Sequence, residues 1–243
     1  MDDERLELIE NIDKYRIGLD EVFAFRCRGC GKCCKNREDI LLNTRDVYNI
    51  ATALKLTHKQ VVETYCDTYI GRDSRIPIVR LKPKGANKVC PLLTGSRCSV
   101  HSLKPTVCAL FPLGRVAVNE EGAEKMGLHG YNKIEYILSP VRCGSLRKKQ
   151  TVLSWLESFG VSKEDKFFIR WNEILCNLAP RIKSFEENES VTDKALDMLW
   201  TGVFNAVYIA YDTQKEFYPQ FEANVTKILG LFEALEHAGC SEN

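Results

Sequence analysis

Apolar residues recur at helical intervals in three places in the first third of the chain. They do so over residues 3–16, after Thr44 and after Thr57. We expect Thr44 to be the N-cap of its helix, and Thr57 with Gln60 to form a capping box for the next one. The cysteine-rich stretch between the first two helices is too polar and too rich in glycine for regular structure, so we expect a loop there.

Alternating apolar and polar positions predict short strands in the middle of the chain. Residues 76–93 alternate and then turn at Pro83–Gly85, which predicts a hairpin that ends near Cys90. Two further strands are expected at 113–122 and 131–138. The cysteine-rich half therefore combines short strands with much irregular chain.

After Cys143 the pattern becomes helical. Amphipathic helices are expected at 150–159, 163–178, 193–211 and 221–237. Pro180 and the polar stretch after it predict a loop, and Pro219 separates the last two helices. The predicted fold is mainly α with a few short β-strands: an irregular cysteine-rich core at 22–145 and a helical C-terminal extension at 146–243.

Composition and charge narrow the class of protein. The chain has 243 residues, of which 44% are hydrophobic and 28% charged, as expected for a folded globular protein. The net charge of +1 gives no overall field that would attract nucleic acid. The charge is uneven, because residues 1–149 carry 26 Lys or Arg against 18 Asp or Glu, and the remaining residues carry 8 against 15. The basic excess thus falls in the cysteine-bearing half.

The N-terminal stretch MDDERLELIE is acidic and lacks the basic and apolar regions of a secretory signal. The apolar run at 204–211 is far shorter than the roughly 20 residues that cross a bilayer. We therefore expect a cytoplasmic protein that does not enter the membrane. Thiols stay reduced in that compartment, so a dense cysteine pattern there indicates metal or redox chemistry rather than disulfides.

Eleven cysteines occur, and eight of them lie near glycine or proline in turn-like segments. These eight are the candidate metal ligands Cys27, Cys30, Cys33, Cys34, Cys90, Cys98, Cys108 and Cys143. The other three, Cys66, Cys176 and Cys240, lie in helix-like segments or at the tail. We expect those three to be buried thiols without a chemical role.

Four of the candidates form a C-x2-C-x2-C run that ends in the adjacent pair Cys33–Cys34. Two cysteines with two residues between them can direct both sulfurs to one ion, so this spacing recurs in zinc and iron–sulfur sites. Adjacent side chains point in different directions, so Cys33 and Cys34 can serve different metals. Eight ligands fit two four-thiolate sites or one multinuclear cluster. His101 is a candidate ninth ligand, although a surface histidine is the favoured interpretation.

Positive side chains fill the gaps between these cysteines. Four thiolates around a zinc ion or an oxidised iron–sulfur core leave a net negative charge, which nearby cations offset. Such cations also lower the pKa values of the thiols. The alternative, a solvated or phosphate-binding surface, would be favoured if the cysteines were absent. The residues concerned are Arg26, Arg28, Lys32, Lys35 and Arg37.

The segments CRGCGKCC and CPLLTGSRCSVHSLKPTVCALFP resemble the CxxCxxCC family of zinc- or iron-chelating proteins, the YkgJ-type cysteine-cluster group. Relatives of this group include the flagellin lysine N-methylases. The resemblance covers roughly residues 22–145 and all eight candidate cysteines. It departs at His101, where relatives often carry tyrosine. The resemblance implies metal binding, and it implies nothing about the helical segment after residue 146.

Two functional hypotheses follow. The first is a metal-binding protein whose eight cysteines hold an iron–sulfur cluster or zinc in a structural or redox role. The alternative is a metal-dependent protein methyltransferase of the flagellin lysine N-methylase type, which would use S-adenosylmethionine. Against the alternative, the sequence has no glycine-rich strand–loop–helix segment and no C-x3-C-x2-C triad.

The ligands do not separate zinc from iron, because closed four-cysteine sites suit both metals. The C-x2-C-x2-C step and the later Cys-Pro favour iron–sulfur, but the bacterial ferredoxin run has three residues before its fourth cysteine. The expected partners are a metal ion or cluster and, through the C-terminal helices, another protein. No nucleic acid is expected.

Overall fold

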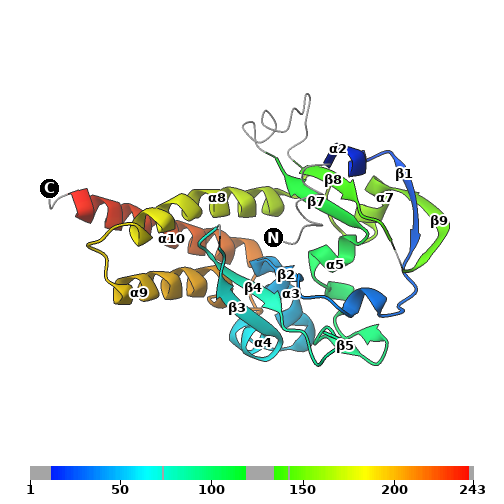
Figure 1. The fold of residues 1–243 in the computed structure, drawn as a ribbon, viewed down its shortest axis with the longest axis horizontal. Coiled ribbons are helices and arrows are strands. Elements are labelled where there is room, and N and C mark those ends of the chain that lie inside the picture. The colour runs from blue at the N-terminus through cyan, green and yellow to red at the C-terminus, as the bar shows by residue number, and fades with distance from the viewer. Residues whose placement is uncertain (1–11, 73, 119–133, 142, 241–243) are drawn as a thin grey trace. The chain divides into compact units, whose positions relative to one another are not determined.

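The structure, a computed structural model, describes residues 12–72, 74–118, 134–141 and 143–240 (Figure 1). The chain divides into two compact units, each built from two separate segments. Unit 1 comprises Met1–Cys33 and Thr106–Asn172, and unit 2 comprises Cys34–Pro105 and Glu173–Asn243. Each unit is described by itself below.

Unit 1 contains two small antiparallel sheets of two strands each. The first sheet pairs β1 (Val22–Arg26) with β9 (Ser145–Thr151). The second pairs β7 (Leu113–Ala117) with β8 (Ile134–Leu138), and this pair confirms the strands expected at 113–122 and 131–138 within the described residues. The helices of the unit are α2 (Ile12–Tyr15), α5 (Thr106–Leu110) and α7 (Val152–Glu157).

The core of unit 1 joins β1 to α5 and α7. Phe25 on β1 lies with its ring centroid 5.7 Å from that of Trp155 on α7, in an edge-to-face arrangement. The indole N–H of Trp155 donates a hydrogen bond of 3.0 Å to the carbonyl oxygen of Leu110 at the end of α5. Buried aromatic pairs of this kind and a satisfied indole stabilise a small core strongly. Strand β1 is therefore held firmly where it leads into the cysteine loop.

Unit 2 is organised around a three-stranded antiparallel sheet with the order β2–β4–β3. A short hairpin, β5–β6, and a single turn of 3-10 helix, η2, follow the sheet in the chain. The strands are β2 (Leu41–Leu42), β3 (Cys66–Ile70), β4 (Pro77–Leu81), β5 (Leu93–Thr94) and β6 (Arg97–Cys98). The helices of this first part of the unit are α3 (Thr44–Leu54), α4 (His58–Tyr65) and η2 (His101–Leu103).

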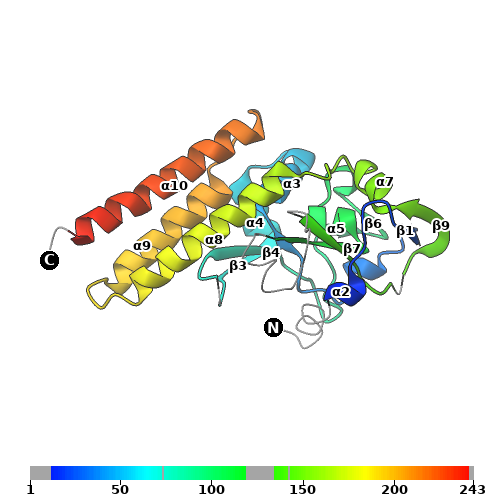
Figure 2. The ribbon, with the colours of Figure 1, turned by 90° about the horizontal axis from the view of Figure 1, so that it is seen from above.

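Long helices form the rest of unit 2. They are α8 (Lys166–Glu186, of which the part from Glu173 belongs to this unit), α9 (Asp193–Phe204), the π-helical turn η3 (Asn205–Ile209) and α10 (Phe217–Cys240). Helices α8, α9 and α10 lie alongside one another (Figure 2), and the rings of Phe185 on α8 and Phe232 on α10 pack with centroids 5.9 Å apart. None of the helices in the described part of the chain is long and apolar enough to cross a membrane.

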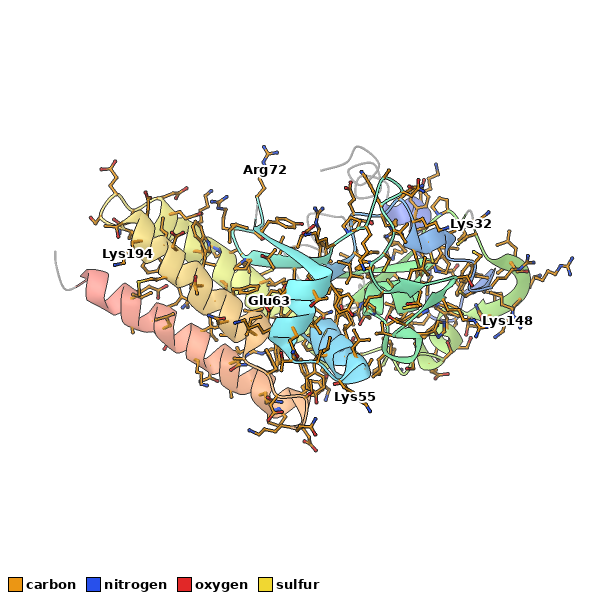
Figure 3. All side chains as sticks on the ribbon, turned by 90° about the horizontal axis from the view of Figure 1, so that it is seen from below. Lys32, Lys55, Glu63, Arg72, Lys148 and Lys194 are labelled. Atoms are coloured by element: carbon orange, nitrogen blue, oxygen red, sulfur yellow. The ribbon has the colours of Figure 1, made fainter. Side chains whose placement is uncertain are left out.

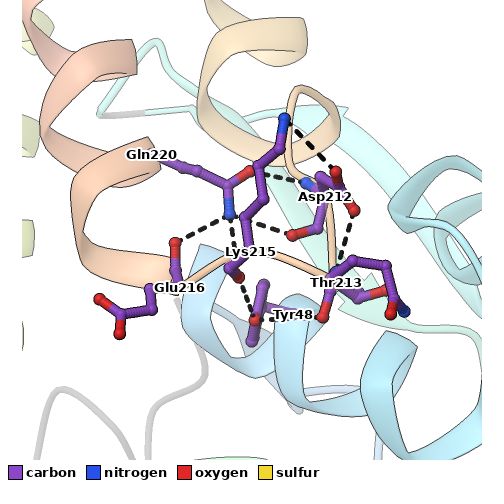
Figure 4. A network of polar contacts seen from close by, with 7 residues as sticks. Tyr48, Asp212, Thr213, Lys215, Glu216 and Gln220 are labelled. Carbon is purple, nitrogen blue, oxygen red and sulfur yellow. Dashed lines mark hydrogen bonds and ion pairs between the residues drawn. The ribbon is translucent and has the colours of Figure 1, made fainter.

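A polar network fixes the loop between η3 and α10 (Figure 4). The side-chain amide of Gln220 donates to the carbonyl oxygens of Asp212, Lys215 and Glu216 at 3.0, 3.2 and 2.9 Å. The hydroxyl of Tyr48, on α3, donates to the Lys215 carbonyl at 2.7 Å. Helix α3 is thereby joined to the C-terminal helices within the same unit.

The prediction of a mainly α fold is wrong. Of the residues that the structure describes, 47% are helical and 20% lie in strands, so the fold mixes α-helices with small β-sheets. Part of the difference comes from residues 145–151, which form β9 at the boundary where the helical extension was expected to begin. Their stable partner, β1, lies about 120 positions earlier in the chain, so local periodicity contains no sign of the pairing.

The local predictions for the first half were partly correct. The capping box of Thr57 with Gln60 is confirmed. At the preceding helix the N-cap is Asn43, which forms its own capping box with Asp46, so the assignment to Thr44 is wrong. Of the helix expected at 3–16, residues 1–11 lie outside the described residues, and Ile12–Tyr15 are helical.

The predicted hairpin over 76–93 is also wrong in its pairing. Strand β4 pairs with β2 and β3, and the chain after the Pro83–Gly85 turn contributes only an isolated bridge between Lys84 and Val89. Strand β3 begins at Cys66, directly after α4, in a segment that reads as helical from its sequence. Tertiary pairing has overridden local propensity at this position.

Neither Pro180 nor Pro219 marks the helix break that was predicted at it. Helix α8 continues through Pro180 to Glu186, so Pro180 does not begin the expected loop, but residues 187–192 form a loop in the polar stretch as predicted. Pro219 lies in the first turn of α10, where its missing N–H removes no helical hydrogen bond. The last two helices are separated at residues 210–216, before Pro219, so the prediction that Pro219 separates them is wrong.

Candidate metal centre

The candidate cysteines fall into both units. Unit 1 contains Cys27, Cys30, Cys33, Cys108 and Cys143, and unit 2 contains Cys34, Cys90 and Cys98. None of the cysteines in the described part of the chain forms a disulfide. Cys27 and Cys30 are exposed and the other six are half-buried, so the thiols lie at or just below the protein surface.

Pairing of β1 with β9 brings two distant cysteine segments to the same end of one sheet. Arg26, the last residue of β1, pairs with Ser145, the first residue of β9. Cys27 therefore leaves the sheet where Cys143 and Gly144 enter it. The loop at 27–33 and Cys143 thus start from neighbouring points, although more than a hundred residues separate them in the sequence.

Gly144 allows this close approach. Its φ angle is +78°, in the left-handed region that favours glycine. A Cβ atom at this position would lie 2.5 Å from Cε2 of Phe25 and 2.8 Å from the carbonyl oxygen of Arg26. Both neighbours belong to β1, so a side chain at position 144 would push the two strands apart next to Cys143.

We expect Gly144→Ala to destabilise unit 1 by about 2–4 kcal/mol, because a left-handed conformation costs about 1–2 kcal/mol and an overpacked contact costs about 1–3 kcal/mol. Gly160→Ala is the matched control, since Gly160 also has a positive φ, of +63°, and has nothing within 4 Å of an added Cβ. The control should lose only about 1–2 kcal/mol, the cost of the conformation. Chemical denaturation measures both, and equal losses would contradict the steric role of position 144.

Backbone N–H groups point at the sulfurs of the first loop. Gly29 and Gly31 have φ angles of +63° and +66°, which turn the chain tightly around the cysteines. The N–H of Gly29 lies 3.4 Å from Sγ of Cys27 and donates to it. The N–H of Lys32, with a smaller contribution from that of Gly144, lowers the pKa of Cys30. The N–H groups of Lys32 and Gly144 thus favour the thiolate of Cys30, which is the form that binds metals.

Cys143 interacts electrostatically with three other cysteines of unit 1. Burial is the main cause that raises its pKa, and the charges of Cys33, Cys30 and Cys27 raise it further. The ammonium group of Lys32 acts in the opposite direction. Cys143 therefore lies within electrostatic range of the three cysteines of the loop, beside the end of the sheet where β1 and β9 meet. We call Cys27, Cys30, Cys33 and Cys143 the sheet-end cysteines.

Three cysteines of unit 2 also lie near one another along connected backbone. The N–H of Cys90 donates to the carbonyl oxygen of Cys34 at 2.8 Å. The N–H of Leu93 donates to the carbonyl oxygen of Cys90 at 3.1 Å, and Leu93 pairs with Cys98 across the β5–β6 hairpin. We call Cys34, Cys90 and Cys98 the hairpin cysteines.

Cys108 lies on α5, within unit 1 and two residues before Leu110, whose carbonyl accepts the Trp155 indole. His101 lies exposed in η2 of unit 2. Over the described residues, no three or more His, Cys, Asp or Glu side chains already form a group arranged to hold a metal ion. The sheet-end cysteines are neighbours, and the side chains of Cys27 and Cys30 are exposed.

The three remaining cysteines differ from the candidates and from one another. Cys66 is buried, as expected, and burial raises its pKa to about 12, so its thiol stays protonated. Cys176 lies exposed on α8, so the expectation that it is buried is wrong. The side chain of Cys240 lies outside the described residues.

Of the five cations expected to offset thiolate charge, one has another role. The guanidinium of Arg37 binds Asp39 through two contacts, Nε to Oδ1 at 2.5 Å and Nη2 to Oδ2 at 2.9 Å. Its charge is therefore largely neutralised. Arg26, Arg28, Lys32 and Lys35 are all exposed, and Lys32 acts on Cys143 as described above.

Comparison with protein families supports the metal-binding interpretation. Residues 26–144 match the CxxCxxCC family, which is described as "Putative zinc- or iron-chelating domain". No curated protein and no solved structure matches the chain. The matched segment contains all eight candidate cysteines. It begins at Arg26 and ends at Gly144, where β1 leads into the cysteine region and β9 follows it.

Proposed function

Because residues 26–144 of this chain belong to the CxxCxxCC family of zinc- or iron-chelating domains, we propose that the protein binds zinc or an iron–sulfur cluster through cysteine thiolates. The observation that carries the proposal is the position of the sheet-end cysteines. Three cysteines at C-x2-C-x2-C spacing and a distant fourth, Cys143, meet at one end of the β1–β9 sheet. Four thiolates from two chain segments are the usual donor set of structural zinc and of iron–sulfur clusters.

The surroundings of these sulfurs fit such a centre. Backbone N–H groups of Lys32 and Gly144 favour the thiolate at Cys30, and the N–H of Gly29 donates to Sγ of Cys27. Lys32 supplies positive charge beside Cys143. A bound zinc would cross-link the two segments, and an iron–sulfur cluster would also supply one-electron chemistry.

The adjacent pair Cys33–Cys34 supports a centre with more than one metal. Cys33 belongs to the sheet-end cysteines in unit 1, and Cys34 belongs to the hairpin cysteines in unit 2. In this proposal residues 22–145 carry all the ligands, with Cys108 as the eighth, and residues 146–243 carry none. The thiols have to stay reduced before metal binds, so we place the protein in the cytoplasm.

Metal analysis of protein purified without oxygen tests the proposal. We expect zinc, or iron with acid-labile sulfide and visible absorption, in a fixed ratio to protein. A ratio above one zinc, or more than one cluster, would assign Cys33 and Cys34 to different metals. A folded preparation that contains neither metal, and whose melting temperature does not rise when zinc or iron and sulfide are added, would contradict the proposal.

A further inference from the structure

Strand β9 presents an unusual outer surface in unit 1. Its central residues, Leu146, Arg147, Lys148 and Lys149, are all exposed. The pairing with β1 shifts register between the Ala24–Lys149 and Arg26–Ser145 pairs, so residues 146–148 bulge out of the regular ladder. Its one neighbour among the described strands is β1, and no described strand lies along its other edge. In both ribbon views β9 forms the outer margin of this unit, and Lys148 is seen on it in Figure 3. A free strand edge is a ready template for another extended chain.

The charged side chains along this edge are all positive. No acidic residue occurs in β1 or β9, and no ion pair involves Arg147, Lys148 or Lys149 in the part of the chain that the structure describes. Arg26 and Arg28, at the sheet end and in the cysteine loop, are exposed and likewise without an ion-pair partner among the described residues. The cations therefore continue from β9 to the metal-binding loop. Like charge would repel a second copy of this strand, so the edge is suited to an acidic partner.

Exposed apolar groups favour a polypeptide as that partner. Leu146 and Val22 are 65% and 60% exposed, on β9 and β1 respectively. The aromatic rings of the sheet, Phe23 and Phe25, are only 4% and 2% exposed. No ring of this sheet is therefore available to stack on bases, as single-stranded nucleic acid requires. Backbone N–H and C=O groups along the strand edge can hydrogen-bond an extended peptide, and the neighbouring aliphatic side chains can contact its apolar residues.

We propose that the free edge of β9 binds an extended acidic segment of another protein, which adds as a strand beside the metal-binding loop. Carboxylates of that segment pair with Arg147, Lys148 and Lys149, and an apolar side chain covers Leu146. The bound segment thus lies next to Cys27 and Cys143, since Ser145 begins β9 and pairs with Arg26. The inference rests on the strand edge and its charges and does not require a particular metal.

The test uses the metal-loaded full chain, labelled with ¹⁵N, and a short capped peptide of alternating Glu and Val residues. We expect amide shifts that are largest at Ser145–Thr151, and an affinity that falls about tenfold or more as salt rises from about 0.05 to about 0.5 M. The same peptide with N-methylated backbone amides on one edge should bind about tenfold more weakly, because it cannot complete the strand ladder.

Charge reversal locates the site. The triple variant R147E/K148E/K149E should lose binding about tenfold or more, while its metal content stays unchanged. The matched control K14E/K163E/K166E changes the net charge equally at three exposed lysines of unit 1 and should bind as the natural chain does. Equal binding of a Lys–Val peptide would overturn the proposal. So would binding of a single-stranded oligonucleotide or of anionic vesicles through these residues when the Glu–Val peptide does not bind.

Discussion

Cys30→Ser should release metal from the sheet-end cysteines and unfold unit 1. Serine has nearly the same shape as cysteine, but its hydroxyl is a hard, protonated donor that replaces a thiolate poorly at zinc or iron. Because structural zinc contributes about 10–16 kcal/mol of apparent binding free energy, and that energy is folding energy, the loss exceeds what a small core can supply. Metal content and the melting temperature measure the effect.

Cys176→Ser is the control for this experiment. Cys176 is exposed on α8 and lies outside the segment that matches the family, so both measurements should stay at their natural values. Cys66→Ser provides a second comparison, because Cys66 is buried and its thiol stays protonated. That variant should keep its metal and lose about 1–2 kcal/mol of stability for the buried hydroxyl. A Cys30→Ser protein that keeps its metal and melts with the natural chain would refute the ligand assignment.

The candidate ligands of the first loop were predictable because their spacing lies within one short segment of the sequence. The C-x2-C-x2-C spacing brings Cys27, Cys30 and Cys33 to one loop whatever the rest of the fold does, and glycines at 29 and 31 supply the required turns. The capping box at Thr57 was predictable for the same reason, since all of its atoms come from four consecutive residues.

The partner of that loop was not predictable from local pattern. Cys143 reaches the sheet-end cysteines because β9 pairs with β1, and the segment SLRKKQT has no alternation of apolar and polar residues that would mark it as a strand. The strand forms because the sheet packs through Phe23 and Phe25 of β1 into a core with Trp155. Long-range packing of this kind decides β-structure more than intrinsic propensity does.

The same limit explains the error in fold class. The helical periodicity after Cys143 is borne out over α8, α9 and α10. The residues that directly follow Cys143 were placed in the same helical region, but they form β9. At Pro180 the error was the reverse, since a loop was predicted where the helix continues. Helix α8 is long enough and packed well enough to pass through a residue that usually ends a helix. The tertiary contacts that hold the helix together on both sides of such a proline cannot be recognised from the sequence pattern.

A buried ion pair in unit 1 supplies the second large expected effect. Arg115 on β7 and Asp165, just before α8, lie 2.7 Å apart from Nη1 to Oδ2, and their side chains are only 7% and 4% exposed. The guanidinium also stacks on Phe168, with Cζ 3.8 Å from the ring centroid. We expect Asp165→Asn to cost about 3–5 kcal/mol, since it leaves the buried cation of Arg115 without its counter-charge.

Asparagine keeps the shape of aspartate and can still accept the hydrogen bond from the N–H of Phe168, so the substitution isolates the charge. Glu164→Gln, at the exposed neighbouring position, should change stability by about 0.5 kcal/mol or less. The double variant Asp165→Asn with Arg115→Met should recover most of the loss, because removing the cation removes the cost of burying it unpaired. Denaturant unfolding of the natural chain, the single variants Asp165→Asn and Arg115→Met, and the double variant forms a double-mutant cycle, with Glu164→Gln as the separate control. If the double variant were as unstable as Asp165→Asn alone, the cost would arise from packing around Asp165 rather than from the unpaired charge of Arg115.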